Sequence, residues 1–168
     1  KDALGRDWQL ATIQLDLVML PERFNLAYID EKGEKQKPIV IHRAILGSFE
    51  RFIGILLEHF AGALPLWLAP VQATVLPVSE KFENYGKKIL SSLHEAGVRA
   101  ELSAANETLG KRIREAEMQK IPYILVVGEK EEKNKSINVR HYKRGQEGEI
   151  SVEKLVSKIR EEIEKKTS

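Results

Sequence analysis

The sequence contains no cysteine, and this absence excludes disulfide bonds and the cysteine-based zinc clusters that stabilise many small domains. Prolines at 65, 70 and 77 interrupt the most apolar stretch, so no run is long enough to cross a membrane. The first seven residues contain neither an apolar run nor a small-residue cleavage site, so a signal peptide is not expected. A reducing, cytoplasmic location is therefore the expected one.

The sequence also has little excess of charge, because its 27 basic and 25 acidic residues leave a net charge of only +2. Such a balance does not by itself mark a nucleic-acid-binding protein, although the part after residue 68 is slightly basic and permits contact with a polyanion. Apolar residues make up 42% and charged residues 31%, as in soluble globular proteins. The length suits one ordinary domain, or a small domain with a piece of another.

The first part of the chain reads as strands followed by a helix. Residues 11–17 alternate, which predicts a strand with a buried apolar face and a polar face of Thr12, Gln14 and Asp16. Two further strands, over 26–29 and 38–41, are expected to form an antiparallel hairpin around the turn-forming DEKGE segment.

A long apolar helix is expected next. From Arg43 to about Ala61 apolar residues recur at helical spacing around most of the circumference, which predicts a largely buried helix. Gly62 and Pro65 are expected to end it.

Strands and helices alternate beyond residue 66, in the order β-α-β-α-β-β-α. The expected strands are 71–76, 98–102, 123–127 and 136–142, the expected helices are 79–96, 109–120 and 151–165, and the charged residues 129–135 are expected to be a turn. Ser79 and Ser151 are candidate N-caps, and Gly97 suits a helix stop. The order predicts an α/β layered domain with a mostly parallel sheet, and hence two domains, 1–66 and 67–168.

Gly47, Arg51 and Gly54 would share one stripe of the expected apolar helix. Each glycine costs about 1 kcal/mol relative to alanine, so the pair indicates close approach of another backbone or room for a flat ligand. A buried arginine needs a partner. A carboxylate would serve, and so would ATP, whose base stacks on a guanidinium and whose phosphates accept its hydrogen bonds. The residues alone favour a carboxylate partner for Arg51 over ATP, and both alternatives stay open.

His42 ends the strand that leads into this helix. Imidazole is a common zinc ligand, but a lone histidine is more often a structural residue. For the polar strand face of Thr12, Gln14 and Asp16, simple solvation is at least as good an explanation as a ligand site.

Four segments together resemble the threonyl-tRNA synthetase family of class II aminoacyl-tRNA synthetases. They are GRDWQ at 5–9, TIQLD at 12–16, LPERF at 20–24 and IHRAILGSFERF at 41–52, of which the last resembles motif 3, and WLAPVQ at 67–72 adds to the likeness. The chain departs from the family at Leu10-Ala11, where a smaller pair is usual, and the stretch 17–20 is one residue longer, which a β-bulge would absorb.

The resemblance implies a role for each residue of the first candidate site. Arg51 would pack on adenine and stabilise the triphosphate, with Gln9 and Thr12 beside the nucleotide. Gln14 would line the threonine pocket, and Ser48 would lie near the substrate. His42 would be one of three ligands of a zinc ion that reads threonine.

The resemblance also implies cofactors and partners. These are ATP with magnesium, zinc, threonine and tRNA(Thr), with a homodimer in the intact enzyme and no membrane. Motifs 1 and 2 and the other zinc ligands are not in this sequence, so its zinc site is incomplete and the chain alone is expected to be inactive. The first domain would be a remnant of the class II antiparallel sheet with its motif 3 helix.

Residues 67–168 resemble the anticodon-binding domain of these enzymes, with a mixed sheet flanked by helices. Arginine donates two hydrogen bonds to guanine, and a carboxylate accepts from base amino groups, so Arg140 and Glu131 suit base readout. Asn106 and Arg114 suit contact with a base or with the RNA backbone. By the resemblance all four contact the anticodon, whereas the residues alone favour an ordinary solvated surface. Thr108 stands where the family is often basic.

Three functions remain to be compared. The first is the C-terminal part of a threonine–tRNA ligase, and the second is a stand-alone anticodon-binding module without catalysis. An unrelated α/β protein for a small ligand has little support, because the sequence lacks the glycine-rich phosphate loops of nucleotide-binding folds.

Overall fold

The computed structural model describes residues 1–166 and divides into two compact units, Lys1–His59 and Phe60–Ser168. Among the described residues no helix is both long and apolar enough to span a bilayer.

Unit 1 is built on one antiparallel strand pair. Its elements are β1 (Thr12–Asp16), α1 (Met19–Arg23), β2 (Tyr28–Ile29), β3 (Lys35–Gln36), β4 (Val40–Ala44) and α2 (Phe49–His59). β1 pairs with β4, while β2 and β3 form a separate two-stranded hairpin. The Asp30 carboxylate fixes the hairpin turn by accepting the backbone N–H groups of Lys32 and Glu34, each at 2.9 Å. The predicted hairpin is therefore present but shorter, and the strand expected over 38–41 pairs with β1 instead.

The helix expected from Arg43 begins only at Phe49, because β4 continues through Ala44. Gly47 lies in the connection between them, with φ of +68°, a conformation that glycine adopts without steric cost. A Cβ at Gly47 would lie 3.7 Å from the backbone oxygen of Leu10. The prediction that Gly47 lies on a helical stripe with Arg51 is therefore wrong. Gly47 instead permits the turn into α2 beside residues 9 and 10, which directly precede β1.

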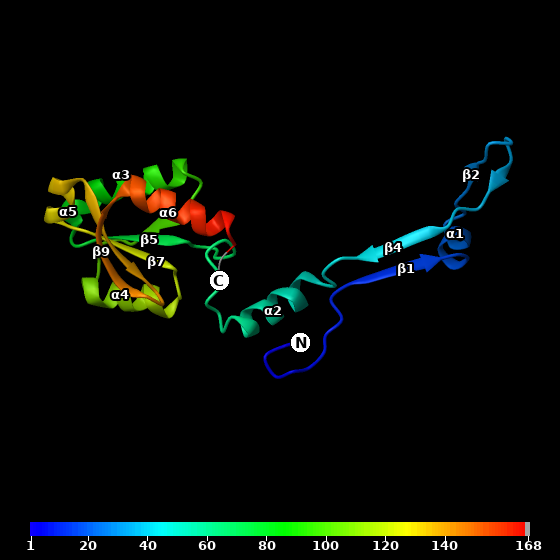
Figure 1. Cartoon of the computed structure of the whole chain (residues 1–168), viewed down its shortest axis with the longest axis horizontal. Helices are drawn as coiled ribbons and strands as arrows, with labels where there is room; N and C mark the ends of the chain where they lie inside the picture. Colours follow the sequence, from blue (N-terminus) through cyan, green and yellow to red (C-terminus); the bar gives the residue numbers. More distant parts are fainter. Residues whose placement is uncertain (167–168) are drawn as a thin grey trace. The chain divides into compact units, whose positions relative to one another are not determined.

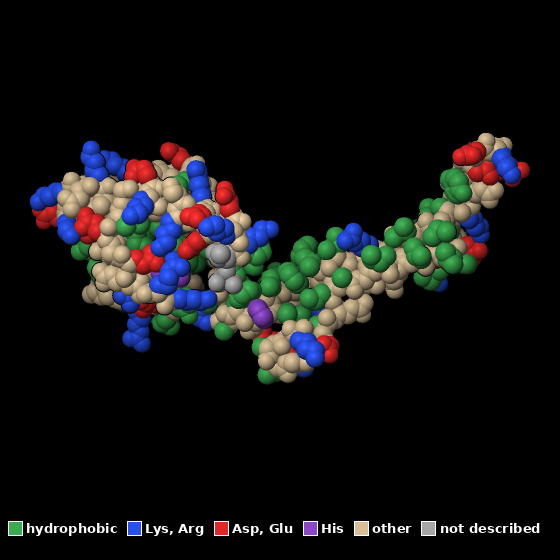
Figure 2. Space-filling view, viewed as in Figure 1, with side chains coloured by type: hydrophobic (Ala, Val, Ile, Leu, Met, Phe, Trp, Pro, Cys, Tyr) green, Lys and Arg blue, Asp and Glu red, His purple; other side chains and the backbone are tan. Residues whose placement is uncertain are grey.

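The expected burial of unit 1 is also wrong. α2 has no buried residue, and Phe49 is 77% exposed. On β1 the side chains of Ile13 and Leu15 are 68% and 65% exposed. Two paired strands, a two-residue hairpin and single helices offer no second layer that could cover these faces. Apolar side chains consequently gather on the surface of unit 1 (Figure 2).

Unit 2 forms one five-stranded mixed sheet with helices on both faces. Its elements are β5 (Ala73–Pro77), η1 (Glu80–Phe82), α3 (Glu83–Glu95), β6 (Ala100–Leu102), α4 (Leu109–Met118), β7 (Tyr123–Val127), α5 (Glu129–Asn134), β8 (Ser136–His141), β9 (Gly145–Ser151) and α6 (Val152–Glu164). The strand order is β6-β5-β7-β8-β9. The first three are parallel, and β8 and β9 are antiparallel additions. The predicted α/β fold with a mixed sheet flanked by helices is confirmed.

Two cores hold the layers together. On one face the sheet meets α3 and α6 through fully buried side chains such as Val75, Leu125, Val139, Leu93 and Ile159. On the other face α4 packs on the sheet through Leu76, Ile124, Ala116 and Ile121. Figure 1 shows the sheet of unit 2 between α4 and the α3–α6 pair. Because β5 is covered on both faces, all five of its residues are buried.

Several local predictions for unit 2 are confirmed, and two elements were missed. Ser151 caps α6 by accepting the backbone N–H of Lys154, and Gly97 follows α3 with φ of +79°. Ser79 precedes η1 without a side-chain cap bond. The charged segment predicted as a turn is the short helix α5, and β9 was not expected. β9 has only one strongly apolar residue, Ile150, so period-two alternation could not reveal it.

Candidate nucleic-acid interface

The sheet face on which α4 packs carries polar side chains where it extends beyond that helix. Arg140 of β8 lies opposite Ile124 of β7, and cross-strand partners point to the same side of a sheet. Ile124 is buried against α4, so Arg140 emerges on the same side as α4. A β-bulge between Val139 and Arg140 shifts the register, which makes Gln146 of β9 the neighbour of Arg140. Bulges re-aim side chains, and this one lies next to the candidate base reader.

Glu117 of α4 orients the Arg140 side chain. Nε of Arg140 donates to Oε1 of Glu117 at 2.6 Å. The Arg140 side chain is 40% exposed to solvent and the Glu117 side chain 34%. Within residues 1–166 Glu117 is the one partner of this guanidinium. The terminal N–H groups therefore remain available as a donor fork, the arrangement that suits bidentate recognition.

Arg114 lies one turn before Glu117 on α4, so the structure brings Arg114 and Arg140 to the same flank of that helix. Arg114 is exposed and has no ion-pair or hydrogen-bond partner among the described side chains. Asn106 is also exposed and lies in the connection between β6 and α4. The predicted readers Asn106, Arg114 and Arg140 are thus all accessible on or beside α4.

Glu131 differs from the other three candidates because it is only 9% exposed. Its Oε2 accepts the backbone N–H of Gly128 at 3.0 Å and so caps the start of α5. A carboxylate at a helix N-terminus also meets the positive end of the helix dipole. A structural role therefore accounts for Glu131 without RNA, and base readout by this residue stays a prediction.

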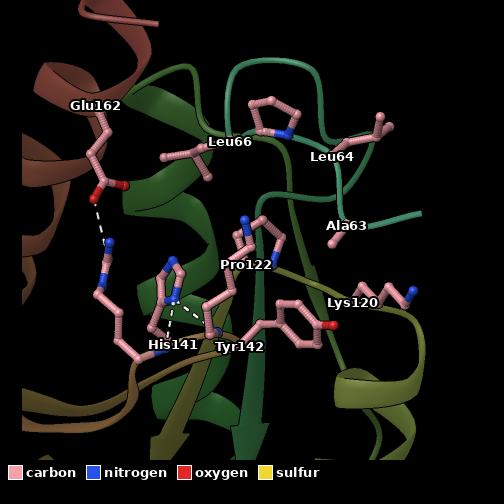
Figure 3. A pocket seen from close by; sticks show the side chains of 11 residues that line it. Ala63, Leu64, Leu66, Lys120, Pro122, His141, Tyr142 and Glu162 are labelled. Carbon is pink, nitrogen blue, oxygen red and sulfur yellow. Dashed lines mark hydrogen bonds and ion pairs between the residues drawn. The ribbon is translucent and has the colours of Figure 1, made fainter. Parts of the chain in front are cut away.

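The turn that follows Arg140 is fixed by a polar network beside a hollow of about 320 Å³. His141 accepts the backbone N–H groups of Lys143 and Arg144 at its Nδ1, and Arg144 bonds Glu147, Glu162 and the Tyr123 hydroxyl. Figure 3 shows His141 and Glu162 in the wall of this hollow, together with Ala63, Leu64 and Leu66. Arg144 and Glu162 bind each other in this wall, and the bonds of Arg144 and His141 stabilise the β8–β9 turn.

In unit 1 the strand register brings Gln14 and His42 together, because they are direct partners in the β1–β4 pair. Both line a shallow hollow formed with residues 15–20. Thr12 lies opposite Ala44 and on the same face of β1 as Gln14, two residues before it. Gln9 lies beyond the strand and approaches Gly47 with its backbone oxygen. The polar face predicted from the alternation therefore exists, and its members lie in one row.

The buried ion pair favoured for Arg51 is not present. Arg51 is exposed, and within the described chain no carboxylate pairs with it. Its guanidinium carbon lies 5.6 Å from the centroid of the Trp8 ring, a cation–π geometry. Trp8 is itself fixed, since its Nε1 donates to Asp2 at 2.8 Å, and this bond lowers the pKa of the Asp2 carboxyl. Ser48 accepts the backbone N–H of Arg51 and so caps α2.

A zinc ion requires several donor side chains close together. Among residues 1–166 no three His, Asp or Glu side chains lie close enough together to hold a metal. His42 is a single candidate ligand, and a structural or catalytic zinc needs at least three from the protein. The described residues therefore do not form a zinc site by themselves.

Sequence reasoning missed Arg112 of α4, which is 3% exposed and bonds three backbone oxygens. A signal was available, because Leu109, Arg112 and Ala116 share the spacing of one helix face, and that face packs on the sheet. Burying a cation on a core-facing stripe costs free energy unless the cation is hydrogen-bonded. Its position therefore indicates that Arg112 has bonding partners inside the domain.

Two family models match the chain. The model described as an anticodon binding domain matches residues 72–162, and the model for the tRNA synthetase class II core domain (G, H, P, S and T) matches residues 1–60. These matches cover the main part of unit 2 and all of unit 1.

Curated relatives are threonine–tRNA ligases. That of Chlorobium phaeovibrioides is 52% identical over 163 residues, which are 97% of this chain and 24% of the relative. That of Thermus thermophilus is 58% identical over 148 residues, which are 88% of this chain and 22% of the relative. The chain thus spans about a quarter of the length of the curated relatives that it matches.

Solved structures show the same likeness. The RNA binding domain of threonyl-tRNA synthetase from Cryptosporidium parvum Iowa II matches with a TM-score of 0.81 and 41% identity, over 95% of this chain and 40% of that one. Prolyl-tRNA synthetase from Cryptosporidium parvum, complexed with L-proline and AMP, matches with a TM-score of 0.70 and 25% identity, over 94% and 35% of the two chains.

Proposed function

We propose that this chain is the C-terminal part of a threonine–tRNA ligase. The proposal starts from the family, because the chain belongs to the anticodon-binding-domain family of aminoacyl-tRNA synthetases. The whole enzyme would activate threonine with ATP and transfer it to tRNA(Thr). The observation that carries the proposal for this chain is the accessible donor set beside α4, in which Arg140 is oriented by Glu117 at 2.6 Å. The identity of about half of all residues to threonine–tRNA ligases supports the choice of amino acid.

Unit 2 would bind the anticodon loop. Unpaired bases are read through hydrogen bonds to their edges, while basic side chains hold the phosphates. Arg140 would read a base with its free N–H fork, Asn106 would read a second, and Arg114 would contact a base or a phosphate. Glu131 would act mainly by holding α5, with its remaining oxygen open to a base amino group.

Unit 1 would supply residues to the activation site. Arg51 would stack on the adenine of ATP and steady its phosphates, which is supported by its exposure and by the absence of a carboxylate partner within residues 1–166. Gln9 and Thr12 would lie beside the nucleotide and its magnesium ion, and Gln14 and Ser48 beside threonine.

In the complete site zinc would supply a Lewis acid that binds threonine, with His42 as one ligand. Residues 1–166 offer no complete set of ligands, so the remaining ligands would come from other parts of the whole enzyme. We also propose, from the family alone, a cytoplasmic location and a homodimer for the whole enzyme. Purified by itself, the chain should show no threonine-dependent pyrophosphate exchange above a heat-killed control.

The stand-alone anticodon-binding module remains the second candidate, because unit 2 holds a complete core of its own. The length of the natural gene separates the two. A reading frame with class II motifs 1 and 2 ahead of residue 1 selects the ligase.

Arg140→Ala tests the readout directly. Wild type and variant are titrated against RNA hairpins that differ only in the three anticodon bases. The variant should lose discrimination at one position by roughly 1–3 kcal/mol, because a fork of donors to a base edge is lost. Arg160→Ala is the matched control, since Arg160 lies on α6 and bonds the backbone oxygen of Ala96. Equal weakening of every hairpin would instead identify Arg140 as a phosphate contact.

A further inference from the structure

Arg112 is a buried cation without a buried anion. Its side chain is on α4, the residue is 3% exposed, and within the described part of the chain no carboxylate forms an ion pair with it. Three backbone oxygens take its N–H groups instead: Pro77 at 2.6 Å, Glu107 at 3.2 Å and Ser103 at 3.4 Å. Burial lowers the pKa of Arg112, and the nearby charge of Glu83 acts in the opposite direction. An arginine stays charged in such a site, and each of its three side-chain nitrogens donates one of these hydrogen bonds.

The three oxygens come from segments that meet at one end of the sheet. Pro77 is the last residue of β5, Ser103 follows β6 directly, and Glu107 precedes the N-cap of α4. Arg112 therefore ties both ends of the connection 103–107 to the end of strand β5. A lysine could not do this, because one ammonium lacks the spread of a planar guanidinium.

The middle of the same connection is held independently. The backbone N–H of Ala105 donates to the carboxylate of Glu83 at 3.4 Å, so α3 also fixes this segment. Thr108 then caps α4 by accepting the backbone N–H of Lys111. Asn106 lies between these anchor points, and its own side chain is exposed.

We propose that Arg112 is a positioning residue for RNA recognition, which holds the connection 103–107 so that Asn106 is presented to an unpaired base of the anticodon loop. Arg112 touches no RNA itself, because it is buried beneath the connection. The inference rests on the proposed function, since it assigns Asn106 a base to read. A segment held in its binding conformation loses less entropy on binding, so this preorganisation raises the affinity for hairpins that carry the base read by Asn106.

The test is Arg112→Lys, with Arg99→Lys as the matched control. Arg99 makes the same kind of contact, because its guanidinium donates to the backbone oxygens of Ala69 and Trp67. It directly precedes β6, however, and the connection 103–107 follows the other end of that strand. Both variants and Asn106→Ala are titrated against hairpins that differ in single anticodon bases. Amide hydrogen exchange of Ala105 in the free protein reports on the connection without RNA.

Arg112→Lys should raise the exchange rate at Ala105 by about tenfold or more, as expected when local opening becomes easier. It should also lower the preference for the cognate base at the position that Asn106→Ala affects, by roughly 5- to 100-fold. Affinity for a mismatched hairpin should change much less, because the phosphate contacts remain. Arg99→Lys should leave both the exchange at Ala105 and the preference unchanged.

Distinct outcomes overturn the inference and the proposed function. If Asn106→Ala reduces the preference and Arg112→Lys does not, the positioning role is wrong while the anticodon function stands. If no hairpin binds to the wild type, the proposed function fails, and the positioning role for RNA falls with it. Should Arg112→Lys not fold, Glu83→Gln weakens the anchor at Ala105 and must reduce the same preference. A Glu83→Gln protein with faster exchange and unchanged preference would refute the inference.

Discussion

At the scale of single residues, His141 shows how neighbours set the chemistry of a side chain. Its ring meets the Tyr123 ring edge-on at 5.1 Å between centroids, and its Nδ1 accepts the backbone N–H groups of Lys143 and Arg144. Burial, reinforced by the cation of Arg144, lowers the pKa of His141 to about 4. The imidazole is thus neutral at physiological pH, and the turn after Arg140 depends on that neutral form.

This pKa shift predicts a pH dependence of stability. Because the folded pKa lies below the unfolded value of about 6.5, the contribution of neutral His141 is complete above pH 6.5 and is lost progressively as the pH falls towards 4. Partial exposure reduces the effect, so we expect about 1–2 kcal/mol rather than the full value of the shift. Lys158 acts in the same direction as Arg144, and Glu147 and Glu162 oppose them.

The measurement is urea unfolding of wild type and His141→Asn between pH 7 and 5. Asparagine keeps an acceptor near the Nδ1 position but does not titrate, so the variant should lose less stability than wild type over this window. Glu149, whose pKa is lowered to about 2 by its hydrogen bond with Lys130, titrates in the folded protein below this window and is present in both proteins. Parallel pH curves for the two proteins would contradict the assignment.

At the scale of elements, two glycines inside helices have opposite surroundings. Gly86 of α3 faces the sheet, and a Cβ there would lie 2.9 Å from Leu102 and 3.0 Å from Pro77. Gly110 of α4 has no atom within 4 Å of such a Cβ, and its φ is not in the left-handed region. The first glycine therefore allows α3 to approach the β5–β6 pair, whereas the second only weakens its helix.

Alanine at each position should separate these roles. Gly86→Ala should destabilise unit 2 by about 1–3 kcal/mol, because α3 must shift away from the sheet. Gly110→Ala should stabilise it by about 0.5–1 kcal/mol, because alanine has the higher helix propensity. Thermal and urea unfolding of the two variants check both signs. A destabilised Gly110→Ala would show that this surface of α4 is closer to other atoms than the structure places it.

At the scale of the whole molecule, the two units differ in what they bury. Unit 2 holds both hydrophobic cores. In unit 1, taken over residues 1–59, Pro21 is the one apolar residue that is buried. Burial of apolar surface is the main driving force of folding, so nearly all the stability of the chain should reside in unit 2.

We therefore expect residues 60–168 to fold alone, with a free energy of unfolding within about 1 kcal/mol of that of the whole chain. Trp8 reports on unit 1 and Trp67 on unit 2, so Trp8→Phe and Trp67→Phe variants resolve the two parts by fluorescence. The Trp67 signal should show one cooperative urea transition, and the Trp8 signal should show none at that midpoint. A shared transition would mean that unit 1 folds together with unit 2.

The sequence by itself determined the local secondary structure and, through its motifs, the family. Hydrophobic periodicity placed β7 at its true bounds, cap residues placed α6, and the LPERF and HRAILGSFERF segments identified the family, because these signals lie in consecutive residues. Tertiary structure alone decided the rest. The pairing of β4 with β1 is a contact between distant segments. Arg51 faces Trp8 instead of a carboxylate, and Glu131 caps α5.

The physical reason is that burial and partner choice are non-local. An apolar period says that a face prefers to be covered, but only the layers present decide whether it is, and unit 1 has no second layer for α2. Likewise, nothing in the residues near Arg112 announces that Pro77, thirty-five positions away, accepts its hydrogen bond. The sequence therefore determined the family and most elements. The fold decided which candidate side chains stay accessible, such as Asn106 and Arg114, and which are bonded within the protein, such as Arg112 and Glu131.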